Sequence, residues 1–321
     1  MRAVGERSGI CLVLLAAALW ATVGVGARIA PSSAGLPPEV LGLARTAIAG
    51  PVILLIATAL LGLRAVTATR LDPLRLLIFA ASNAVFQIGL FRCFTLLGVT
   101  VTVFLTVCLP PVLAMIASWL RRREPVSAGS AAALALALTG LLLIADDGLL
   151  RVRLAGSGEG LLTAVLAAVA FVAMSDAARS LGRGAPPLVV AGTGLSCSSV
   201  FLMLFLPIVT KVDVSGLAAG LSDPRFVGLV LYLGLGPTAL AYVCYCAGIA
   251  RCRSALVGLI ASMIEPAIAA CLAVWVLSDR LSTAETGGCA LLMMSMLVLW
   301  LSERMIARKR RPAVAAAPRA G

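Results

Sequence analysis

Residues Gly236–Ser282 read GPTALAYVCYCAGIARCRSALVGLIASMIEPAIAACLAVWVLSDRLS, and they predict two membrane-spanning helices joined by a short basic turn. The turn is Arg251–Arg253, and Glu265 follows it by 12 residues inside the second apolar run. At a rise of ~1.5 Å per residue, this carboxylate lies roughly 18 Å from the turn, near the middle of a bilayer. Pro266 comes next and removes a backbone hydrogen bond, so we expect the helix to break or bend there.

A carboxylate at that depth is costly in lipid, so it usually faces a polar space or a partner. Two interpretations of Glu265 follow. In the functional one, it contacts a cationic group of a substrate or takes part in proton coupling. In the structural one, it holds the broken helix at Pro266. The sequence does not decide between them.

The composition excludes a soluble domain. The chain is 61% hydrophobic and 12% charged, and apolar runs long enough to span a bilayer recur from end to end. The formal charge of +12 comes from basic residues in short loops between these runs. That placement is typical of membrane topology, so we expect no nucleic-acid partner. The sequence has no histidine and no C-x-x-C pair, and we expect no metal and no cofactor.

The apolar runs predict an all-α integral membrane protein with ten transmembrane helices. The first run, which starts near the N-terminus, is too long for a cleaved signal peptide and is taken as a retained span. The ten predicted spans are Ile10–Ile29, Val40–Leu61, Leu74–Leu96, Val99–Leu120, Ser127–Ala145, Gly160–Leu181, Leu188–Val209, Phe226–Ala247, Ser254–Leu277 and Ala284–Leu301.

A weak internal repeat divides these spans into two groups of five. A shift of 151 residues places Trp20 on Phe171, and a shift of 155 places Gln87 on Tyr242. An odd number of helices per repeat inverts the second half, an arrangement that many transporters use with the ligand between the halves. The predicted divisions are a first five-helix repeat at 1–150, a second at 151–306 and a disordered basic tail at 307–321.

The 155-residue shift also places Pro111 on Pro266 and Pro110 on Glu265. We therefore expect a second helix break at Pro111. The carboxylate itself is not duplicated, because its counterpart is a proline.

Basic residues also predict the orientation. The segments on the N-terminal side of the membrane hold 18 Lys and Arg residues, whereas the opposite loops hold 6. Basic residues favour the cytoplasmic side, so we expect both termini in the cytoplasm. The chain uses arginine far more often than lysine, which suggests a bacterial source, so we expect the protein in the bacterial inner (plasma) membrane. Asp176, near the inner mouth, has Arg179 as a candidate partner.

Three short motifs occur in order along the second half: Thr-Ala-Leu-Ala-Tyr at Thr238–Tyr242, Glu265-Pro266, and an acid-x-Leu-Ser sequence at Asp279–Ser282. Together they resemble the second repeat of the EamA-type family of the drug/metabolite transporter superfamily. The resemblance extends over Ile10–Leu301. Where the family usually has Gly-Glu before the final helix, this chain has Ser278-Asp279. The resemblance implies a permease for amino acids, metabolites or drugs, usually an exporter.

Two arginines lie within predicted spans. Arg45 is six residues beyond Glu39 and can clamp a carboxylate or phosphate, or pair with a structural partner. It also resembles an arginine that the family often has, in the pattern Leu-x-x-x-Arg at Leu41–Arg45. Arg92 lies near the outer end of the third span, where it can contact substrate or extend its charge to the membrane surface.

Further candidate site residues are polar or aromatic. Asn83 and Gln87 are four residues apart and share a helix face, and Arg92 continues this polar stripe. The stripe can line a substrate cavity or hydrogen-bond to neighbouring helices. Tyr242 can line the opposite wall. Trp20 can stack on a substrate or pack against other aromatic rings.

Two classes of function are compatible with this pattern. A secondary transporter that works by alternating access fits the spans, the repeat and the mid-span carboxylate. A multi-spanning enzyme acting on lipid-linked substrates is the alternative, but the sequence has no H-E-x-x-H motif and no P-loop. We therefore predict a transporter and not an enzyme. The predicted partners are a small-molecule substrate, the lipid bilayer and protons as a candidate coupling ion, with monomer and homodimer both open.

Overall fold

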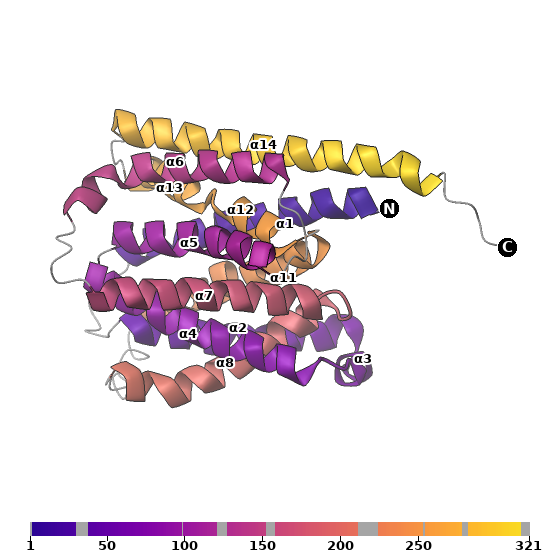
Figure 1. The fold of residues 1–321 in the computed structure, drawn as a ribbon. Coiled ribbons are helices and arrows are strands. Elements are labelled where there is room, and N and C mark those ends of the chain that lie inside the picture. Colours follow the sequence, from indigo (N-terminus) through magenta and orange to yellow (C-terminus); the bar gives the residue numbers. More distant parts are fainter. Residues whose placement is uncertain are drawn as a thin grey trace.

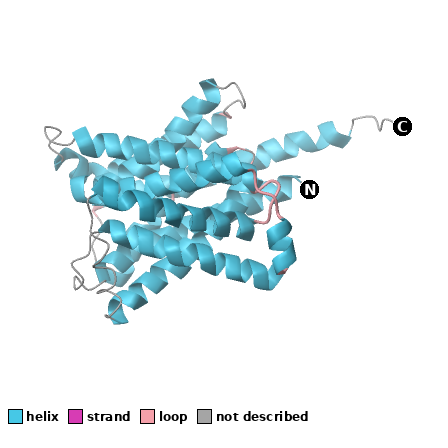
Figure 2. Cartoon of the chain, turned by 90° about the horizontal axis from the view of Figure 1, so that it is seen from below, coloured by secondary structure: helices cyan, strands magenta, loops and turns pink. Residues whose placement is uncertain are grey.

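The computed structural model describes residues 2–29, 38–97, 99–120, 127–151, 158–210, 224–252, 254–277 and 282–315. Within these ranges every regular element is a helix (Figure 2). The helices lie side by side in one bundle, and α1 begins at the same end of it at which α14 ends (Figure 1). The predicted all-helical fold is confirmed.

The helices follow the predicted spans closely. The first part of the chain forms α1 (Arg2–Ile29), α2 (Pro38–Leu61), α3 (Leu63–Ala68), α4 (Pro73–Leu97), α5 (Val99–Leu120) and α6 (Ala128–Arg151). The second part forms α7 (Gly158–Leu181), α8 (Pro187–Thr210), α10 (Pro224–Gly234), the π-helix η3 (Leu235–Leu240), α11 (Ala241–Arg251), α12 (Ala255–Ser262), α13 (Glu265–Leu277) and α14 (Thr283–Ala315).

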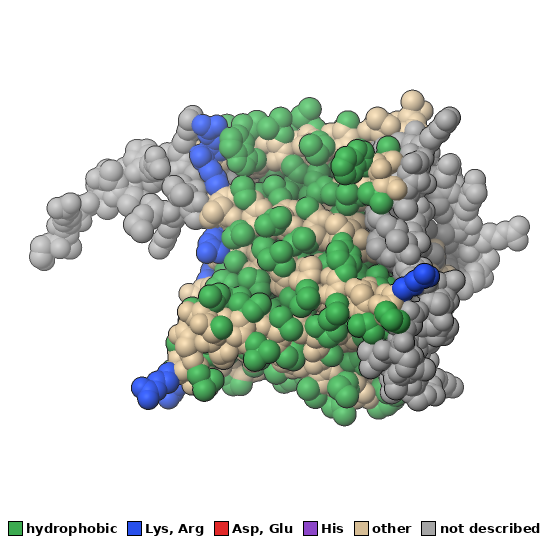
Figure 3. All heavy atoms as spheres, turned by 180° about the vertical axis from the view of Figure 1, so that it is seen from behind, with side chains coloured by type: hydrophobic (Ala, Val, Ile, Leu, Met, Phe, Trp, Pro, Cys, Tyr) green, Lys and Arg blue, Asp and Glu red, His purple; other side chains and the backbone are tan. Residues whose placement is uncertain are grey.

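The length and composition of these helices indicate a protein that crosses the membrane several times. Within the described ranges, six helices or runs of consecutive helices are long and apolar enough to span a bilayer, and four shorter helices are also apolar. Apolar side chains cover the face of the bundle drawn in Figure 3, and basic side chains line the end where α1 begins and α14 ends. The total of ten spans stays a prediction.

The helix is interrupted directly before Glu265 and Pro266. Helix α12 ends at Ser262, a turn follows at Met263 and Ile264, and α13 begins at Glu265. Ser254 caps the start of α12 by accepting a hydrogen bond from the Val257 N–H over 3.4 Å. The interruption expected beside the carboxylate is therefore present.

The second expected break does not occur. Helix α5 continues without interruption through Pro110 and Pro111. A proline inside a membrane helix removes one backbone donor, but neighbouring helices and hydroxyl side chains can compensate, so the helix continues.

A π-helix that the sequence analysis did not predict interrupts the span between α10 and α11. In an α-helix the N–H of residue 237 would donate to the carbonyl of Leu233, but Pro237 has no N–H. The Thr238 hydroxyl donates to this carbonyl instead, over 2.6 Å. The side chain after the proline therefore supplies the missing donor, and the chain widens into η3 (Leu235–Leu240).

The last helix is longer than its predicted span. Helix α14 continues to Ala315, so residues 307–315 are helical where a disordered tail was expected. Alanine and arginine are strong helix formers, and this segment is rich in both. Residues 316–321 lie outside the described residues.

Four pairs of helices form the main seams between the two parts of the chain: α4 with α7, α6 with α14, α2 with α8, and α1 with α11. Small residues let these helices approach closely. A Cβ atom at Gly140 of α6 would lie 2.7 Å from the Gly288 carbonyl oxygen of α14. Backbone atoms occupy the space that any side chain at Gly140 would need.

This contact predicts a selective loss of stability. Gly140→Val should destabilise the protein by about 1–3 kcal/mol, because the added atoms meet backbone that cannot rotate away. Thermal unfolding of the protein in detergent measures the effect. Gly228→Val in α10 is the matched control, since an added Cβ there has no atom within 4 Å. Equal melting temperatures for the two variants would contradict the packing at the α6–α14 seam.

Candidate functional site

Arg45 of α2 is buried against α4. Its side chain is only 5% exposed, and its Nη2 donates to the Gln87 Oε1 atom over 2.7 Å. The guanidinium carbon also lies 5.5 Å from the centre of the Phe91 ring. Gln87 and Phe91 are four residues apart, so successive turns of α4 provide an acceptor and an aromatic face for the same charge.

A second buried hydrogen bond joins α4 to α11. The Tyr242 hydroxyl donates to the Asn83 Oδ1 atom over 2.7 Å, and both side chains are buried. Asn83 lies one turn before Gln87, so the two amides share one face of α4 as predicted. Through this face, α4 contacts Arg45 in the first part of the chain and Tyr242 in the second.

Aromatic rings pack beside these contacts. Trp20 of α1 lies 5.7 Å from Tyr242, 5.2 Å from Tyr245 and 6.2 Å from Phe171, measured between ring centres. The Tyr245 hydroxyl is 2.6 Å from the Ser175 hydroxyl of α7, which satisfies it in the buried interior. Trp20 thus belongs to an aromatic cluster that adjoins the polar residues.

Glu265 approaches this group from α13. Its side chain remains partly accessible, although the neighbouring residues Ile264 and Ala267 are buried. The carboxylate interacts electrostatically with Arg45 and Tyr242. Among the described residues, however, Glu265 and Arg45 form no direct ion pair. The Arg45 guanidinium and the Glu265 carboxylate therefore attract each other without direct contact.

The polar residues on α2 and α4 retain unpaired hydrogen-bond donors. Arg45 Nε, Asn83 Nδ2 and Gln87 Nε2 are buried and find no acceptor in the described part of the chain. The orientation of the Gln87 amide is fixed, because arginine is only a donor and must face the amide oxygen. Three unpaired buried donors are a feature that usually has an explanation, and a ligand with acceptor oxygens supplies one.

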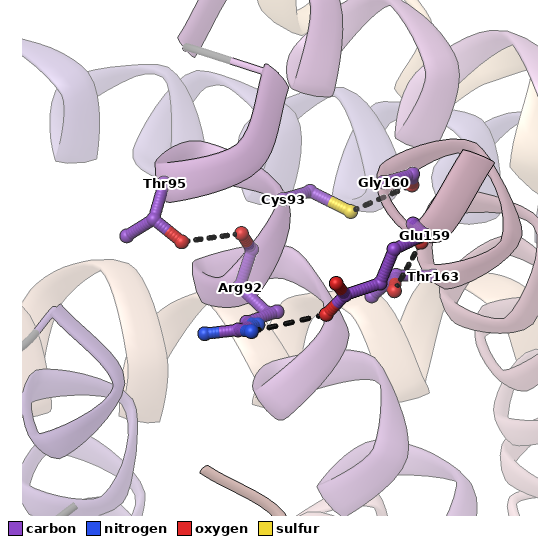
Figure 4. Close-up of polar contacts among 6 residues, drawn as sticks. All are labelled: Arg92, Cys93, Thr95, Glu159, Gly160 and Thr163. Carbon is purple, nitrogen blue, oxygen red and sulfur yellow. Dashed lines mark hydrogen bonds and ion pairs between the residues drawn. The ribbon is translucent and has the colours of Figure 1, made fainter. Parts of the chain in front are cut away.

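We define the central cluster as Trp20, Arg45, Asn83, Gln87, Tyr242 and Glu265. Arg92 lies outside this cluster. Its Nη2 is 3.0 Å from the Glu159 Oε1 atom of α7, and both side chains are substantially exposed (Figure 4). The polar stripe that was expected to include Arg92 therefore ends at Gln87. Near the end of α4 the long side chain extends to a carboxylate at the margin of the bundle.

Asp176 pairs with a different arginine from the one expected. Its Oδ2 atom is 3.3 Å from the Arg75 Nη1 atom of α4. Arg179 instead donates from Nε to the Cys252 carbonyl over 3.2 Å. The pair Arg75–Asp176 and the pair that includes Arg92 thus both join α4 to α7, near opposite ends of the two helices.

Sequence reasoning missed some contributors to the site. Phe91 was overlooked, although its spacing of four residues from Gln87 places it on the same helix face. Tyr245 and Ser175 carry no local signal, because they meet only when α7 and α11 pack together. In the described part of the chain, no group of three or more Cys, Asp or Glu residues is placed to hold a metal ion.

Comparisons with known proteins agree with this architecture. The model of the EamA-like transporter family matches residues 7–145 and again residues 158–301. The uncharacterized transporter YwfM of Bacillus subtilis (strain 168) is 29% identical over 295 residues, which are 91% of this chain and 93% of that protein. A solved structure, described only as the crystal structure of a protein, superposes with a TM-score of 0.72 at 22% identity, covering 94% of this chain and 99% of that one.

The chain is therefore a multi-pass membrane transporter. It belongs to the EamA-like transporter family, within the drug/metabolite transporter superfamily. The family and this relative are both described as transporters and not as enzymes.

The contacts of Arg45 predict a difference between the two arginines. Arg45→Lys should destabilise the protein by about 1–3 kcal/mol, because lysine keeps the charge but loses the planar contacts with Gln87 and Phe91. Arg92→Lys should cost less than about 1 kcal/mol, since exposed ion pairs contribute little. Thermal unfolding in detergent compares them. A larger loss for the Arg92 variant would mean that Arg45 is not held as described.

Proposed function

We propose that this protein is a secondary transporter that moves a small metabolite, amino acid or drug across the plasma membrane by alternating access, as an exporter. The observation that carries the proposal is the set of three buried donors in the central cluster, Arg45 Nε, Asn83 Nδ2 and Gln87 Nε2, that have no acceptor among the described residues. Soluble and membrane proteins rarely leave three donors unpaired in a buried position, and such departures are concentrated at functional sites. The cluster draws residues from α1, α2, α4, α11 and α13, so a ligand bound there contacts both parts of the chain.

The distribution of charge favours a substrate with two different ends. On α2 and α4, the Arg45 guanidinium and the amides of Asn83 and Gln87 offer donors, which suit a carboxylate or another oxygen-rich group. On α13, Glu265 offers a carboxylate to a cationic or donor group. Trp20 supplies an apolar and aromatic surface beside them. A zwitterionic molecule satisfies all three contacts.

The packing of helices supports two inverted five-helix halves, with 1–150 as the first and 151–306 as the second. In two equivalent halves α4 corresponds to α11 and α7 to α1, so the α4–α7 seam corresponds to the α1–α11 seam. Helix α2 corresponds to α8 and α6 to α14, so each of the other two seams joins a pair of equivalent helices. Trp20 and Phe171, which the 151-residue shift aligns, lie 6.2 Å apart between ring centres. Residues that are equivalent in two halves meet in this way near an axis that relates the halves.

The charge distribution supports cytoplasmic termini in a bacterial inner membrane. Basic side chains line the end of the bundle where Figure 1 places both termini (Figure 3). Under this orientation, 18 Lys and Arg residues are cytoplasmic and 6 are on the opposite side.

Reporter fusions test this orientation. A reporter at residue 150 should be accessible only from outside the cell, and one at residue 183 only from inside, because an odd number of spans separates them. Cysteine labelling at the same positions in intact and opened cells provides an independent measurement. A reporter at residue 183 that is active outside would overturn the arrangement.

Substrate class is tested with purified protein in liposomes. Vesicles are loaded with labelled zwitterionic, anionic or cationic small molecules, and efflux is followed with and without an imposed pH gradient. The proposal requires efflux of at least one class above that of protein-free vesicles, with zwitterions favoured over the other two. Failure of every class in folded protein would contradict a transport role for the cluster.

The role of Glu265 is tested with the substrate that this panel identifies. Glu265→Gln keeps the volume of the side chain but fixes it neutral, so gradient-driven transport should fall by at least about tenfold while exchange can persist. Glu265→Asp should keep part of the activity, because the charge remains on a shorter side chain. Glu159→Gln is the matched control at the exposed end of α7 and should transport normally.

The structural interpretation of Glu265 gives the opposite order. It predicts near-normal transport for Glu265→Gln and impaired transport for Glu265→Asp, since shape and not charge would matter. Full gradient-driven transport by the Gln variant would therefore remove Glu265 from the coupling mechanism.

A further inference from the structure

Two arginines from opposite ends of the chain lie against one tryptophan. Arg7 belongs to α1, whereas Trp300 and Arg304 lie one turn apart on α14. The guanidinium carbons of Arg7 and Arg304 are 5.8 Å and 5.1 Å from the centre of the Trp300 ring. The first and last helices thus bring two positive charges to a single indole.

These two guanidinium groups are short of acceptors. The Nε atoms of Arg7 and Arg304 are both buried and have no hydrogen-bond partner among the described residues. In the described part of the chain, neither arginine forms an ion pair with a carboxylate. By contrast, Arg75 and Arg92 each reach a carboxylate. The indole stabilises each cation separately but does not neutralise either, and no carboxylate among the side chains that the structure describes pairs with them.

The position of the pair indicates where a counterion can come from. Arg7 lies in the first turns of α1 and Arg304 in the second half of α14, and basic side chains line the end of the bundle where α1 begins and α14 ends (Figures 1 and 3). Tryptophan is frequent at the level of lipid headgroups, and anionic headgroups gather beside basic residues at that level. The planar fork of arginine matches phosphate oxygens, which accept two donors at once.

The surface beside the pair suits a lipid better than a free anion. Leu297, Leu301 and Met305 are exposed and follow one another at four-residue intervals along α14. Leu301 directly follows Trp300 and Met305 directly follows Arg304, so this apolar row lies beside the pair on the surface of α14. A phosphate held at the arginines therefore has an apolar path next to it, leading toward the middle of the membrane, along which an acyl chain can lie.

We propose that Arg7, Trp300 and Arg304 form a binding site for the phosphate of an anionic phospholipid headgroup. The phosphate accepts hydrogen bonds from both guanidinium groups, and the lipid's acyl chain covers the apolar face of α14. The bound lipid then joins α1 to α14 where the chain begins and ends. This site is separate from the central cluster and does not depend on the transported substrate.

The test uses the full-length protein in detergent. Phosphatidylglycerol should raise the melting temperature by about 2–4 °C, because it binds the folded protein. Phosphatidylcholine and inorganic phosphate at matched concentrations should not. The double variant Arg7→Gln/Arg304→Gln should lose this shift. The double variant Arg64→Gln/Arg70→Gln removes the same charge from α3 and the loop after it, and should keep the shift.

Three results would overturn the proposal. They are an unchanged shift in Arg7→Gln/Arg304→Gln, an equal loss in the Arg64 and Arg70 control, and equal stabilisation by inorganic phosphate, which would assign the site to a free anion. If the glutamine variant is too unstable, Arg7→Lys/Arg304→Lys keeps both charges. Lipid retention in native mass spectrometry should then show about tenfold weaker binding, as expected when charge-assisted forked contacts are lost. Unchanged retention would also overturn the site.

Discussion

A guanidinium buried between membrane helices loses its hydration, and the protein has to replace it with acceptors, aromatic faces or opposite charge. Arg45 receives one of each: the Gln87 oxygen, the Phe91 ring and the more distant charge of Glu265. These groups belong to α4 and α13, so one charge on α2 constrains how both helices are placed around it. The same requirement explains why α4 turns its amide side chains, Gln87 and Asn83, toward the interior of a largely apolar bundle.

Two backbone irregularities lie directly before residues of the cluster. The π-helix η3 ends just before Tyr242, and the turn between α12 and α13 ends at Glu265. Irregular backbone inside a membrane is tolerated only where protein groups satisfy its polar atoms, and the Thr238 hydroxyl does this for the Leu233 carbonyl. The cluster is therefore built on two helices that depart from regular geometry, which is common at functional sites.

The features that the sequence predicted are those encoded locally. Run length gave the spans, a spacing of four gave the shared face of Asn83 and Gln87, and a proline beside a carboxylate gave the break at Glu265. The features it missed depend on contacts between distant segments. By spacing along α4, Arg92 continues the polar stripe. The sequence does not show that its partner Glu159 lies on another helix, α7. The same local rule failed at Pro111, where α5 is not interrupted. A proline permits a break without requiring one.

The two ion pairs between α4 and α7 also have a mechanical consequence. Arg75 and Arg92 are 17 residues apart on α4, and their partners Asp176 and Glu159 are 17 residues apart on α7. The antiparallel helices are thus fastened at two points about 25 Å apart. A slide of one turn, about 5.4 Å, would separate both pairs together. The ion pairs fix the register of the two helices, while the extensive packing along α4 and α7 holds them together. A change in shape therefore falls to elements that pack less extensively, such as α13 against α14.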